Sequence, residues 1–400
     1  MNNRHITLAE GFVAAGVKCG IKASGKHDMA IIAGDRDVAA AVALTTNQVF
    51  GEPVRYCRQV LPKGFGIIRG VVINAGCSNV CTGPAGLRDA KMMASLTAKK
   101  LGTSADMVLV ASTGIIGHRL PMEKVKAGIE AAAGALGRNN DADTLRAIMT
   151  TDTREKSAVT QVRIGGKTIT IGGIVKGSGM IAPSLATMIG VITTDAAISP
   201  AMLNKALRQT VSGSFNAITV DSDTSTSDTV FVMASGKAGN KLISSAGADF
   251  KAFATALAEV CGELARSVVV DGEGATKLVE IAVSGARSDQ DARIAGKSVA
   301  DSPLFKCAIH GGDPNWGRIA AALGKSSAKV DPAKLVIKIG GVTIFARGTG
   351  RKFDLGKVEK HLAGKTVHVQ CDLGLGSGQM TALTCDLSRE YIAINADYHT

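Results

Sequence analysis

Residues Val159–Val175 read VTQVRIGGKTITIGGIV, and apolar and polar side chains alternate on both sides of the Gly165-Gly166 pair. A period of two predicts a pair of β-strands, and adjacent glycines are typical of the tight turn of a β-hairpin. The stretch that follows, Gly177–Thr194, runs for eighteen residues without a charged side chain. Its glycines, its hydroxyl side chains and Pro183 argue against a membrane-spanning helix and favour a turn that leads into a buried strand.

Strand and helix patterns alternate along the rest of the chain. Met107–Ala111 has the composition of a buried strand, and Met122–Leu136 and Asp249–Arg266 place apolar residues at the spacing of amphipathic helices. A hairpin is expected over Lys334–Phe345, and the aromatic and β-branched residues of Tyr391–Ile394 predict a terminal strand. The chain as a whole therefore has an α/β or α+β pattern.

Composition excludes several classes of protein. The 400 residues include 46 basic and 34 acidic side chains, a formal net charge of +12, but the basic residues form no run of five or six. Only 1 Trp, 3 Tyr and 10 Phe are present, too few for a platform that stacks bases. We therefore expect no nucleic-acid partner and no membrane partner, and the positive charge suits acidic small substrates.

The N-terminal residues and the cysteines indicate the cellular compartment. Residues 1–7 carry no apolar core of a signal peptide and lack the Arg and Ser enrichment of a transit peptide. The eight cysteines are dispersed and form no C-x-x-C pair, which is typical of reduced thiols in a cytosolic protein. The sequence therefore predicts a cytoplasmic location.

Three familiar motifs are incomplete. Gly20–Lys26 matches the first seven positions of a phosphate-binding loop, but His27 occupies the place of the Ser or Thr that binds magnesium. Gly177–Ala182 fits the pattern G-x-G-x-x-A of a dinucleotide site, yet Pro183 follows where that site needs a helix. Asp221 opens a calcium-like loop that lacks the required Gly and Glu, so we interpret it as a turn residue that binds nearby amides.

The histidines form no metal-ligating pair, and we expect no metal and no organic cofactor.

Hydroxyl side chains in glycine-rich turns remain as candidates for chemistry. They lie at Ser112–Gly117, at Thr150–Thr153 and at Thr187. A Thr hydroxyl is a weak nucleophile unless a base lies beside it, and the α-amine of the same residue becomes that base once the preceding peptide bond is cut. An α-amine has a reference pKa of about 7.7 to 8.0, so an appreciable fraction is neutral at pH 7. An Ala-Thr pair is common, so this pattern alone does not identify an enzyme.

A longer segment around Thr187 resembles a known family. Lys176–Met188, KGSGMIAPSLATM, closely resembles the self-cleavage segment of the ornithine acetyltransferases, also called glutamate N-acetyltransferases or the ArgJ family. The resemblance covers nearly the whole chain. Seven further segments are similar to family blocks in the family order: Gly11–Val17, Thr45–Asn47, Asn74–Gly76, Ser112–Gly117, Ile218–Thr226, Asp313–Arg318 and Ile394–Thr400. So many segments in one order make a chance match untenable.

The resemblance implies a precursor that cuts itself between Ala186 and Thr187. The Thr187 hydroxyl would attack the Ala186 carbonyl, an N-to-O acyl shift would give an ester, and water would release chains 1–186 and 187–400. Both chains are expected to form one intertwined catalytic unit. The implied fold is a layered α/β (α+β) sandwich of the self-cleaving DmpA/ArgJ-like type with an N-terminal Thr nucleophile, and the implied assembly is an α2β2 heterotetramer.

The implied reaction moves an acetyl group from N2-acetyl-L-ornithine to L-glutamate through an acetyl ester on Thr187, with ping-pong kinetics. Thr113 and Gly114 are similar to the family's oxyanion-hole donors, the first through its hydroxyl and the second through its backbone amide. The residues that match the family's substrate contacts are Thr153, Lys176, Thr187, Glu273, Asn395 and Thr400. Lys176 suits a substrate carboxylate, and Glu273 suits an ammonium group. The resemblance implies no cofactor, and the sequence leaves open whether acetyl-CoA also serves as an acetyl donor.

Two other interpretations stay open from the sequence. A self-cleaving aminopeptidase or amidase of similar fold would pass the acyl group to water, and a non-catalytic binding protein of the same fold would stay uncut. The sequence also departs from the family pattern at Cys77, Cys81, Ser222, His310 and His399. None of these is an implied catalytic residue, so the departures bear on the choice of acetyl acceptor.

Overall fold

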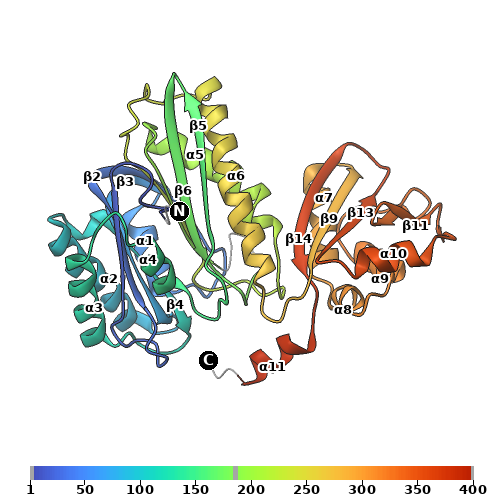
Figure 1. Cartoon of the computed structure of the whole chain (residues 1–400), viewed down its shortest axis with the longest axis horizontal. Helices are drawn as coiled ribbons and strands as arrows, with labels where there is room; N and C mark the ends of the chain where they lie inside the picture. The colour runs from blue at the N-terminus through green and yellow to red at the C-terminus, as the bar shows by residue number, and fades with distance from the viewer. Residues whose placement is uncertain (1–3, 183–187, 398–400) are drawn as a thin grey trace.

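The computed structural model describes residues 4–182 and 188–397, which form two lobes (Figure 1). Within these residues the first lobe contains an eight-stranded sheet of order β4-β3-β2-β8-β7-β6-β5, with β1 paired to β2 beside that path. Its strands are β1 (Phe12–Val17), β2 (Met29–Leu44), β3 (Phe65–Cys77), β4 (Val108–Ile115), β5 (Ser157–Ile164), β6 (Lys167–Lys176), β7 (Ile189–Thr194) and β8 (Thr229–Ala234). The second lobe contains a six-stranded sheet of order β12-β11-β10-β13-β9-β14. Its strands are β9 (Leu278–Ala286), β10 (Val336–Ile339), β11 (Val342–Ala346), β12 (Thr349–Gly350), β13 (Thr366–Asp372) and β14 (Gly378–Cys385).

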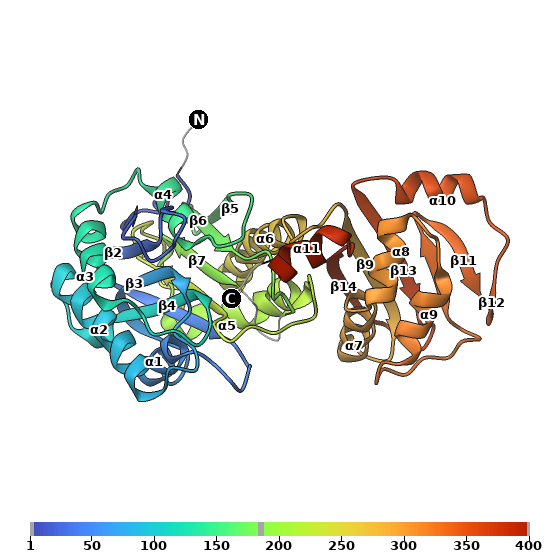
Figure 2. The same cartoon turned by 90° about the horizontal axis from the view of Figure 1, so that it is seen from below.

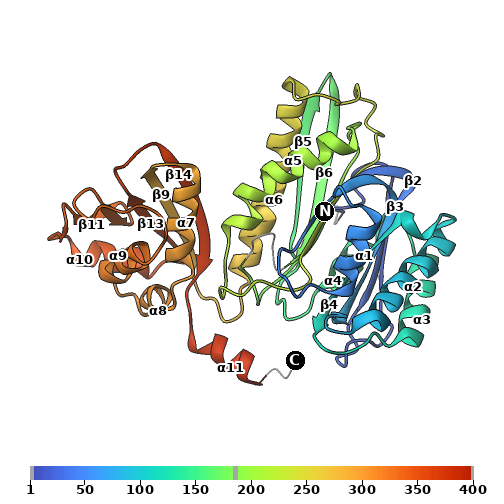
Figure 3. The ribbon, with the colours of Figure 1, turned by 180° about the vertical axis from the view of Figure 1, so that it is seen from behind.

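Helices pack against both sheets (Figures 1 and 3). The first lobe contains α1 (Glu52–Val60), α2 (Gly83–Leu101), α3 (Met122–Gly134), α4 (Asp141–Ile148), α5 (Pro200–Gly213) and α6 (Ala248–Val270). The second contains α7 (Asp289–Ala300), α8 (Pro303–Gly311), α9 (Trp316–Gly324) and α10 (Leu355–Leu362), and α11 (Arg389–Asp397) follows β14. In the part of the chain that the structure describes, no helix combines the length and the apolar character needed to cross a membrane.

The hairpin predicted around Gly165 and Gly166 is confirmed. β5 and β6 pair antiparallel, and both glycines of the turn have positive φ angles, 57° and 78°. β7 pairs antiparallel with β6, with Lys176 opposite Ile189, and parallel with β8. The end of β6 and the start of β7 therefore lie side by side at one edge of the sheet.

Two apolar clusters lie on opposite faces of the first sheet. Along β2, Ala40 and Val42 belong to one cluster, and Ala41 and Ala43 belong to the other. This alternation is expected for an extended strand that is buried on both faces. Helices α1 to α4 pack over the first cluster, and α5 and α6 pack over the second. The prediction of a layered α/β sandwich is confirmed.

The second sheet buries one face. Along β13, Val367 and Val369 are buried, whereas His368 and Gln370 are exposed. The buried side chains form a third apolar cluster with residues of α7 to α10. A sheet covered on one side is typical of antiparallel pairing, which most of these strands follow.

The C-terminal segment differs from its prediction. Tyr391–Ile394 lies in helix α11, not in a terminal strand. Figures 1 and 2 show that α11 leaves β14 and returns towards the first lobe, away from the strands of either sheet. A segment without a neighbouring strand satisfies its backbone groups better as a helix, because a helix makes these bonds internally. The Ser388 hydroxyl anchors its start, since it donates to the Gly274 carbonyl (2.6 Å) and accepts from the Tyr391 amide (3.4 Å).

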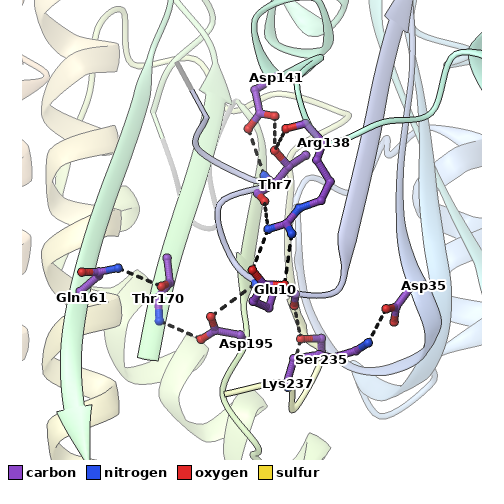
Figure 4. A network of polar contacts seen from close by, with 10 residues as sticks. All are labelled: Thr7, Glu10, Asp35, Arg138, Asp141, Gln161, Thr170, Asp195, Ser235 and Lys237. Atoms are coloured by element: carbon purple, nitrogen blue, oxygen red, sulfur yellow. Dashed lines mark hydrogen bonds and ion pairs between the residues drawn. The ribbon is translucent and has the colours of Figure 1, made fainter. Parts of the chain in front are cut away.

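Carboxylates tie the N-terminal segment to the first sheet (Figure 4). Asp141 of α4 accepts a hydrogen bond from the Thr7 amide (3.0 Å), and Glu10 pairs with Arg138 (3.0 Å). Asp195, directly after β7, accepts from the Glu10 amide (3.4 Å) and from the amide of Thr170 in β6 (2.8 Å). These contacts fix the end of the first sheet opposite to the edge where β6 ends.

Candidate active site

A cavity of about 130 Å³ lies at the edge of the first sheet where β4 and β6 end. Its polar lining consists of the hydroxyl residues Ser78, Thr113, Thr150, Thr151, Ser225, Thr226 and Ser227, with Lys176, Glu273 and Asn395. Sites for drug-sized ligands measure roughly 300–1,000 Å³. The cavity therefore suits a small polar ligand such as an amino acid.

Strand β4 carries the two residues that the resemblance assigns to an oxyanion hole. It pairs in parallel with β3, with Thr113 opposite Ala75 and Gly114 opposite Gly76. Gly114 has a φ angle of 123°, and a Cβ atom there would lie 2.4 Å from the carbonyl carbon of Gly76. Only glycine fits at this position, because any side chain would meet the neighbouring backbone. Thr113 and Gly114 both line the cavity at this point of close approach between β3 and β4.

Lys176 ends β6 and is buried. Its Nζ atom lies 3.1 Å from the Oγ1 atom of Thr113. An ammonium group has donors only, so Thr113 accepts this bond and its own hydroxyl proton is left for another acceptor. Burial lowers the pKa of Lys176, and the negative charge of Asp152 opposes that shift. The arrangement places a positive charge and a hydroxyl donor together in the cavity wall.

A buried cluster of Asp152, Lys156 and Asp271 lies next to Lys176. The Nζ atom of Lys156 pairs with Asp152 Oδ1 at 2.7 Å and also with Asp271 Oδ2, and no side chain of the three is more than 3% exposed. Asp152 also accepts a hydrogen bond from the Gly177 amide (2.7 Å). Burial pushes the pKa of Asp152 upwards, but Lys156 and Lys176 outweigh it and lower that pKa. An ionised Asp152 thus holds the end of β6 in place.

Four residues with predicted roles are not among the described residues that line the cavity. Thr153 does not line it, and its amide (3.1 Å) and hydroxyl both donate to the carboxylate of Asp271. Ala186, Thr187 and Thr400 lie outside the described residues. The roles expected of these residues stay predictions.

Glu273 and Asn395 form another wall of the cavity. The Nδ2 atom of Asn395, in α11, donates to Glu273 Oε2 at 2.9 Å, and the Glu273 amide donates to the Ser178 carbonyl at 2.9 Å. A Cβ atom on Gly179 would lie 2.4 Å from Glu273 Oε2, so a side chain there would displace the carboxylate. Helix α11, where the sequence predicted a strand, is therefore the element that brings Asn395 to the site.

Asp221 anchors the segment after β6. Its carboxylate accepts the amides of Met180 (2.6 Å) and Ile181 (2.7 Å). The interpretation that Asp221 binds a nearby amide is confirmed, because its carboxylate also accepts the Asp223 amide (3.4 Å), but the two shorter bonds come from residues forty and forty-one positions away. Such a contact depends on the tertiary fold and has no signal in local turn chemistry.

Asp228 lies beside the cavity, next to the lining residue Ser227, and was not predicted from the sequence. It is buried, and it hydrogen-bonds the backbone of Met188 and the side chain of Ser225. Within the described residues, its Oδ2 atom has no hydrogen-bond partner. Burial raises the pKa of Asp228 well above its ordinary value, against the effect of the hydrogen bonds and of Lys176. The sequence signal that could have found it is its position two residues after Ile218–Thr226, a segment that resembles a family block.

The structure brings five of the predicted site residues to one cavity. They are Thr113, Gly114, Lys176, Glu273 and Asn395, and they come from β4, β6, the loop after α6 and α11. In residues 4–182 and 188–397, no group of three or more His, Cys, Asp or Glu side chains is arranged to hold a metal ion.

Comparisons with known proteins give the family. The sequence model of the ArgJ family matches residues 13–400. The chain belongs to the ArgJ family. A relative named "Arginine biosynthesis bifunctional protein ArgJ" from Symbiobacterium thermophilum is 47% identical over 99% of this chain and 98% of its own length. A relative of the same name from Synechocystis is 42% identical over 99% of this chain and 98% of its own length.

A solved member of the ArgJ family shares the fold. The crystal structure of arginine biosynthesis bifunctional protein argJ from Bacillus halodurans is 40% identical, with a TM-score of 0.50. The match covers 52% of this chain and 97% of that chain. The ArgJ-like fold predicted from the resemblance is therefore confirmed.

Proposed function

We propose that this protein is a self-processing acetyltransferase of arginine biosynthesis, which moves an acetyl group from N-acetylornithine to glutamate. The names of the ArgJ relatives support the pathway. The observation that carries the proposal is the contact between Lys176 and Thr113, beside Gly114, in a cavity of amino-acid size. A hydroxyl donor, a backbone amide and a buried cation are the groups that acyl transfer needs around a developing oxyanion.

Self-cleavage comes first in the proposed mechanism. The Thr187 hydroxyl attacks the Ala186 carbonyl carbon, the C–N bond breaks as the ester C–O bond forms, and water hydrolyses the ester to a carboxylate. The cut frees the amine of Thr187 as a local base. The solved Bacillus halodurans chain supports such a cut, because it is about half as long as this chain: 97% of that chain matches 52% of this one. Residues 187–400 make up 214 of the 400 residues, or about 54%, a similar share.

Acetyl transfer then proceeds in two half-reactions. The Thr187 oxygen attacks the acetyl carbonyl of N-acetylornithine, the amide C–N bond breaks, and ornithine leaves with the proton that the Thr187 amine has taken up. The α-amine of glutamate next attacks the acetyl ester and restores the hydroxyl. Thr113 and Gly114 stabilise both tetrahedral intermediates, and removal of one such donor costs roughly 2.7–4 kcal/mol. The Lys176 contact keeps the Thr113 proton available for that purpose.

Charged groups of the cavity position the amino-acid substrates. Lys176 pairs with a substrate carboxylate, and Glu273, which already accepts from Asn395, pairs with a substrate ammonium. We extend the proposal to Thr187 and Thr400 as further substrate contacts, and leave out Thr153, whose amide and hydroxyl both donate to Asp271. The reaction needs no metal and no organic cofactor in this scheme, because the acetyl group travels on a side chain.

The two products of the cut remain one catalytic unit in this proposal. Strand β7 follows the cut and pairs with β6, which precedes it, while β8 pairs with β2. Each product thus supplies strands that hydrogen-bond strands of the other. We further propose an α2β2 heterotetramer in the cytoplasm.

The deciding experiment is the denatured mass of the purified protein and of Thr187→Ala. We expect chains of about 19 and 22 kDa, which divide 41.0 kDa in proportion to 186 and 214 of 400 residues, and a single uncut chain in the variant. A single chain of 41.0 kDa from active protein would overturn the free-amine mechanism.

A transfer assay separates the acetyltransferase from an amidase. N-acetylornithine is supplied with and without glutamate, and ornithine and N-acetylglutamate are measured. Ornithine release that depends on glutamate, with equal amounts of N-acetylglutamate, supports transfer. Equal release without glutamate would identify hydrolysis and overturn the proposal.

A further inference from the structure

Two large apolar side chains line the otherwise polar cavity of the candidate active site. They belong to Ile116 and Met180, and the other described residues around the cavity are glycines or carry polar groups. Ile116 is 37% exposed and Met180 is 41% exposed. Single exposed apolar side chains are common on protein surfaces. Two of them in one small concave surface, beside charged groups, offer a place for the apolar part of a ligand.

Backbone contacts fix the chain on both sides of Ile116. The amide of Ser78 (3.0 Å) and its hydroxyl (2.7 Å) donate to the carbonyl of Ile115, and the Gly117 amide donates to the Val80 carbonyl (3.0 Å). Gly117 has a φ angle of 85°, a conformation that glycine adopts without strain. An ordered segment directly after β4 therefore presents the Ile116 side chain to the cavity.

The backbone of Met180 is also fixed on both sides. Its amide donates to the Asp221 carboxylate (2.6 Å). The next residue, Ile181, is fully buried, and its carbonyl accepts the Val220 amide (2.6 Å). Met180 has a φ angle of 56°, an uncommon value for a residue with a side chain, which the contacts around it maintain. Little backbone entropy is lost when a ligand covers side chains that are held in this way.

The two side chains continue different walls of the cavity. Ile116 lies two residues after Gly114, on the wall proposed to bind the acetyl oxygen. Met180 follows Gly179, which lies against the Glu273 carboxylate. A substrate whose acetyl group lies at the first wall and whose ammonium group pairs with Glu273 therefore extends its methylene groups between the two apolar side chains.

We infer that Ile116 and Met180 bind the side-chain methylene groups of the amino-acid substrates and select for the length of that chain. The inference rests on the proposed function, because it takes the cavity as the amino-acid site. Ornithine has three methylene groups between its α-carbon and its side-chain ammonium, and glutamate has two before its side-chain carboxylate. Apolar contacts with this chain favour both substrates over shorter amino acids, whatever charge the chain carries at its end.

The magnitude follows from the apolar surface that is removed from water. Burial of one methylene group is worth about fourfold in a binding constant. Norvaline has the carbon chain of ornithine without the terminal ammonium, so it tests the apolar contacts separately from an ion pair with Glu273. Its side chain is two carbon atoms longer than that of alanine. We therefore expect norvaline to bind about tenfold more tightly than alanine.

Titrations of the purified protein followed by ligand-detected NMR measure the binding of alanine and norvaline. Displacement by ornithine establishes that norvaline occupies the ornithine site. The variants are Met180→Gln, which keeps the length of the side chain, and Ile116→Thr, which keeps the branch at Cβ. Each places a polar group against the chain and should reduce the preference for norvaline about threefold or more, while alanine binding stays within twofold.

Met92→Gln and Ile67→Thr are the matched controls. They make the same substitutions at side chains that are 52% and 47% exposed and do not line the cavity. We expect neither control to change the preference for norvaline. Equal melting temperatures for all four variants establish that their fold is intact.

Steady-state kinetics provide a second measurement. Met180→Gln should raise the KM for N-acetylornithine about threefold and leave kcat within twofold, because the apolar contact is the same in the substrate complex and in the transition state.

Three results would overturn the inference. The first is norvaline binding that is no tighter than alanine binding, or that ornithine does not displace, in the unsubstituted protein. The second is an unchanged preference in either cavity variant. The third is equal weakening of alanine and norvaline, since the residue would then support the amino-acid head or the fold. If transfer from N-acetylornithine to glutamate is absent, the proposed function fails, and the norvaline titration still tests the apolar contacts.

Discussion

Replacing Lys156 with Met removes the one ammonium group between two buried carboxylates beside the candidate site. Asp152 and Asp271 would remain, with side chains 0% and 3% exposed. Removing one partner of a buried ion pair costs about 3–5 kcal/mol, because the remaining charge is neither solvated nor paired. Two carboxylates share this lysine, so we expect a loss of about 4–5 kcal/mol in the free energy of unfolding at pH 8.

The loss should shrink as the pH falls. In Lys156→Met, Lys176 is the remaining lysine that opposes the burial of Asp152, so burial raises the folded-state pKa of Asp152 above the unfolded value of about 3.9. A raised pKa favours the folded state at low pH and is unfavourable as pH rises, so the variant regains stability between pH 8 and pH 5. In the unsubstituted protein burial is outweighed by Lys156 and Lys176, the pKa of Asp152 is lowered, and Asp152 stabilises the fold throughout that range.

Urea denaturation followed by circular dichroism measures both effects. Both measurements use protein that also carries Thr187→Ala, because the expected cleavage into two chains would complicate the unfolding transition. The single Trp316 lies in the second lobe, so its fluorescence would report on the wrong part of the molecule. Lys167→Met, at the exposed start of β6, is the control and should change stability by less than about 0.5 kcal/mol. A loss below about 1 kcal/mol for Lys156→Met, or one independent of pH, would refute the reasoning.

Three further predictions concern the site and its support. Thr113→Val removes a hydroxyl donor and should lower kcat for acetyl transfer about 10²- to 10³-fold in initial-rate assays, and a loss below tenfold would contradict its role. Gly179→Ala places a Cβ atom 2.4 Å from a carboxylate oxygen of Glu273 and should raise the substrate KM about tenfold, whereas Gly262→Ala, with open space around it, should not. Asp386, directly after β14, accepts hydrogen bonds from the amide (2.8 Å) and the hydroxyl (2.6 Å) of Thr276. Burial pushes the pKa of Asp386 upwards, but its hydrogen bonds outweigh burial and lower that pKa. Its stabilisation should be present above pH 3.9 and lost below, so Asp386→Asn should cost about 1–3 kcal/mol in urea at pH 7 and less at pH 3.

Sequence patterns predicted most of the local structure correctly. The hairpin around Gly165, the helices that became α3 and α6, and the hairpin of β10 and β11 all follow from side-chain period and turn residues. Tyr391–Ile394 was misread, because strand-forming residues become a strand only where another strand is within hydrogen-bonding reach. The assembly of the β10–β11 hairpin with β9, β12, β13 and β14 into a separate six-stranded sheet also had no local signal.

The candidate site was predicted in part. The family resemblance placed Thr113, Gly114, Lys176, Glu273 and Asn395 on the list of site residues, and all five line the cavity. The order of these residues along the chain does not give the distances between their side chains or the charges that surround them. Asp228 and the hydrogen bonds of Thr153 to Asp271 emerged only from the fold.

By itself, the sequence determined most of the local elements, the family and the residue types available for acyl transfer. A local element depends on neighbours within a few positions along the chain, and the family follows from the order of segments that need no knowledge of the fold. The tertiary structure alone decided that Lys176 meets Thr113, 63 residues away, and that Lys156 meets Asp271, 115 residues away. The energy of a buried charge depends on every group packed around it, and those groups come from distant parts of the chain.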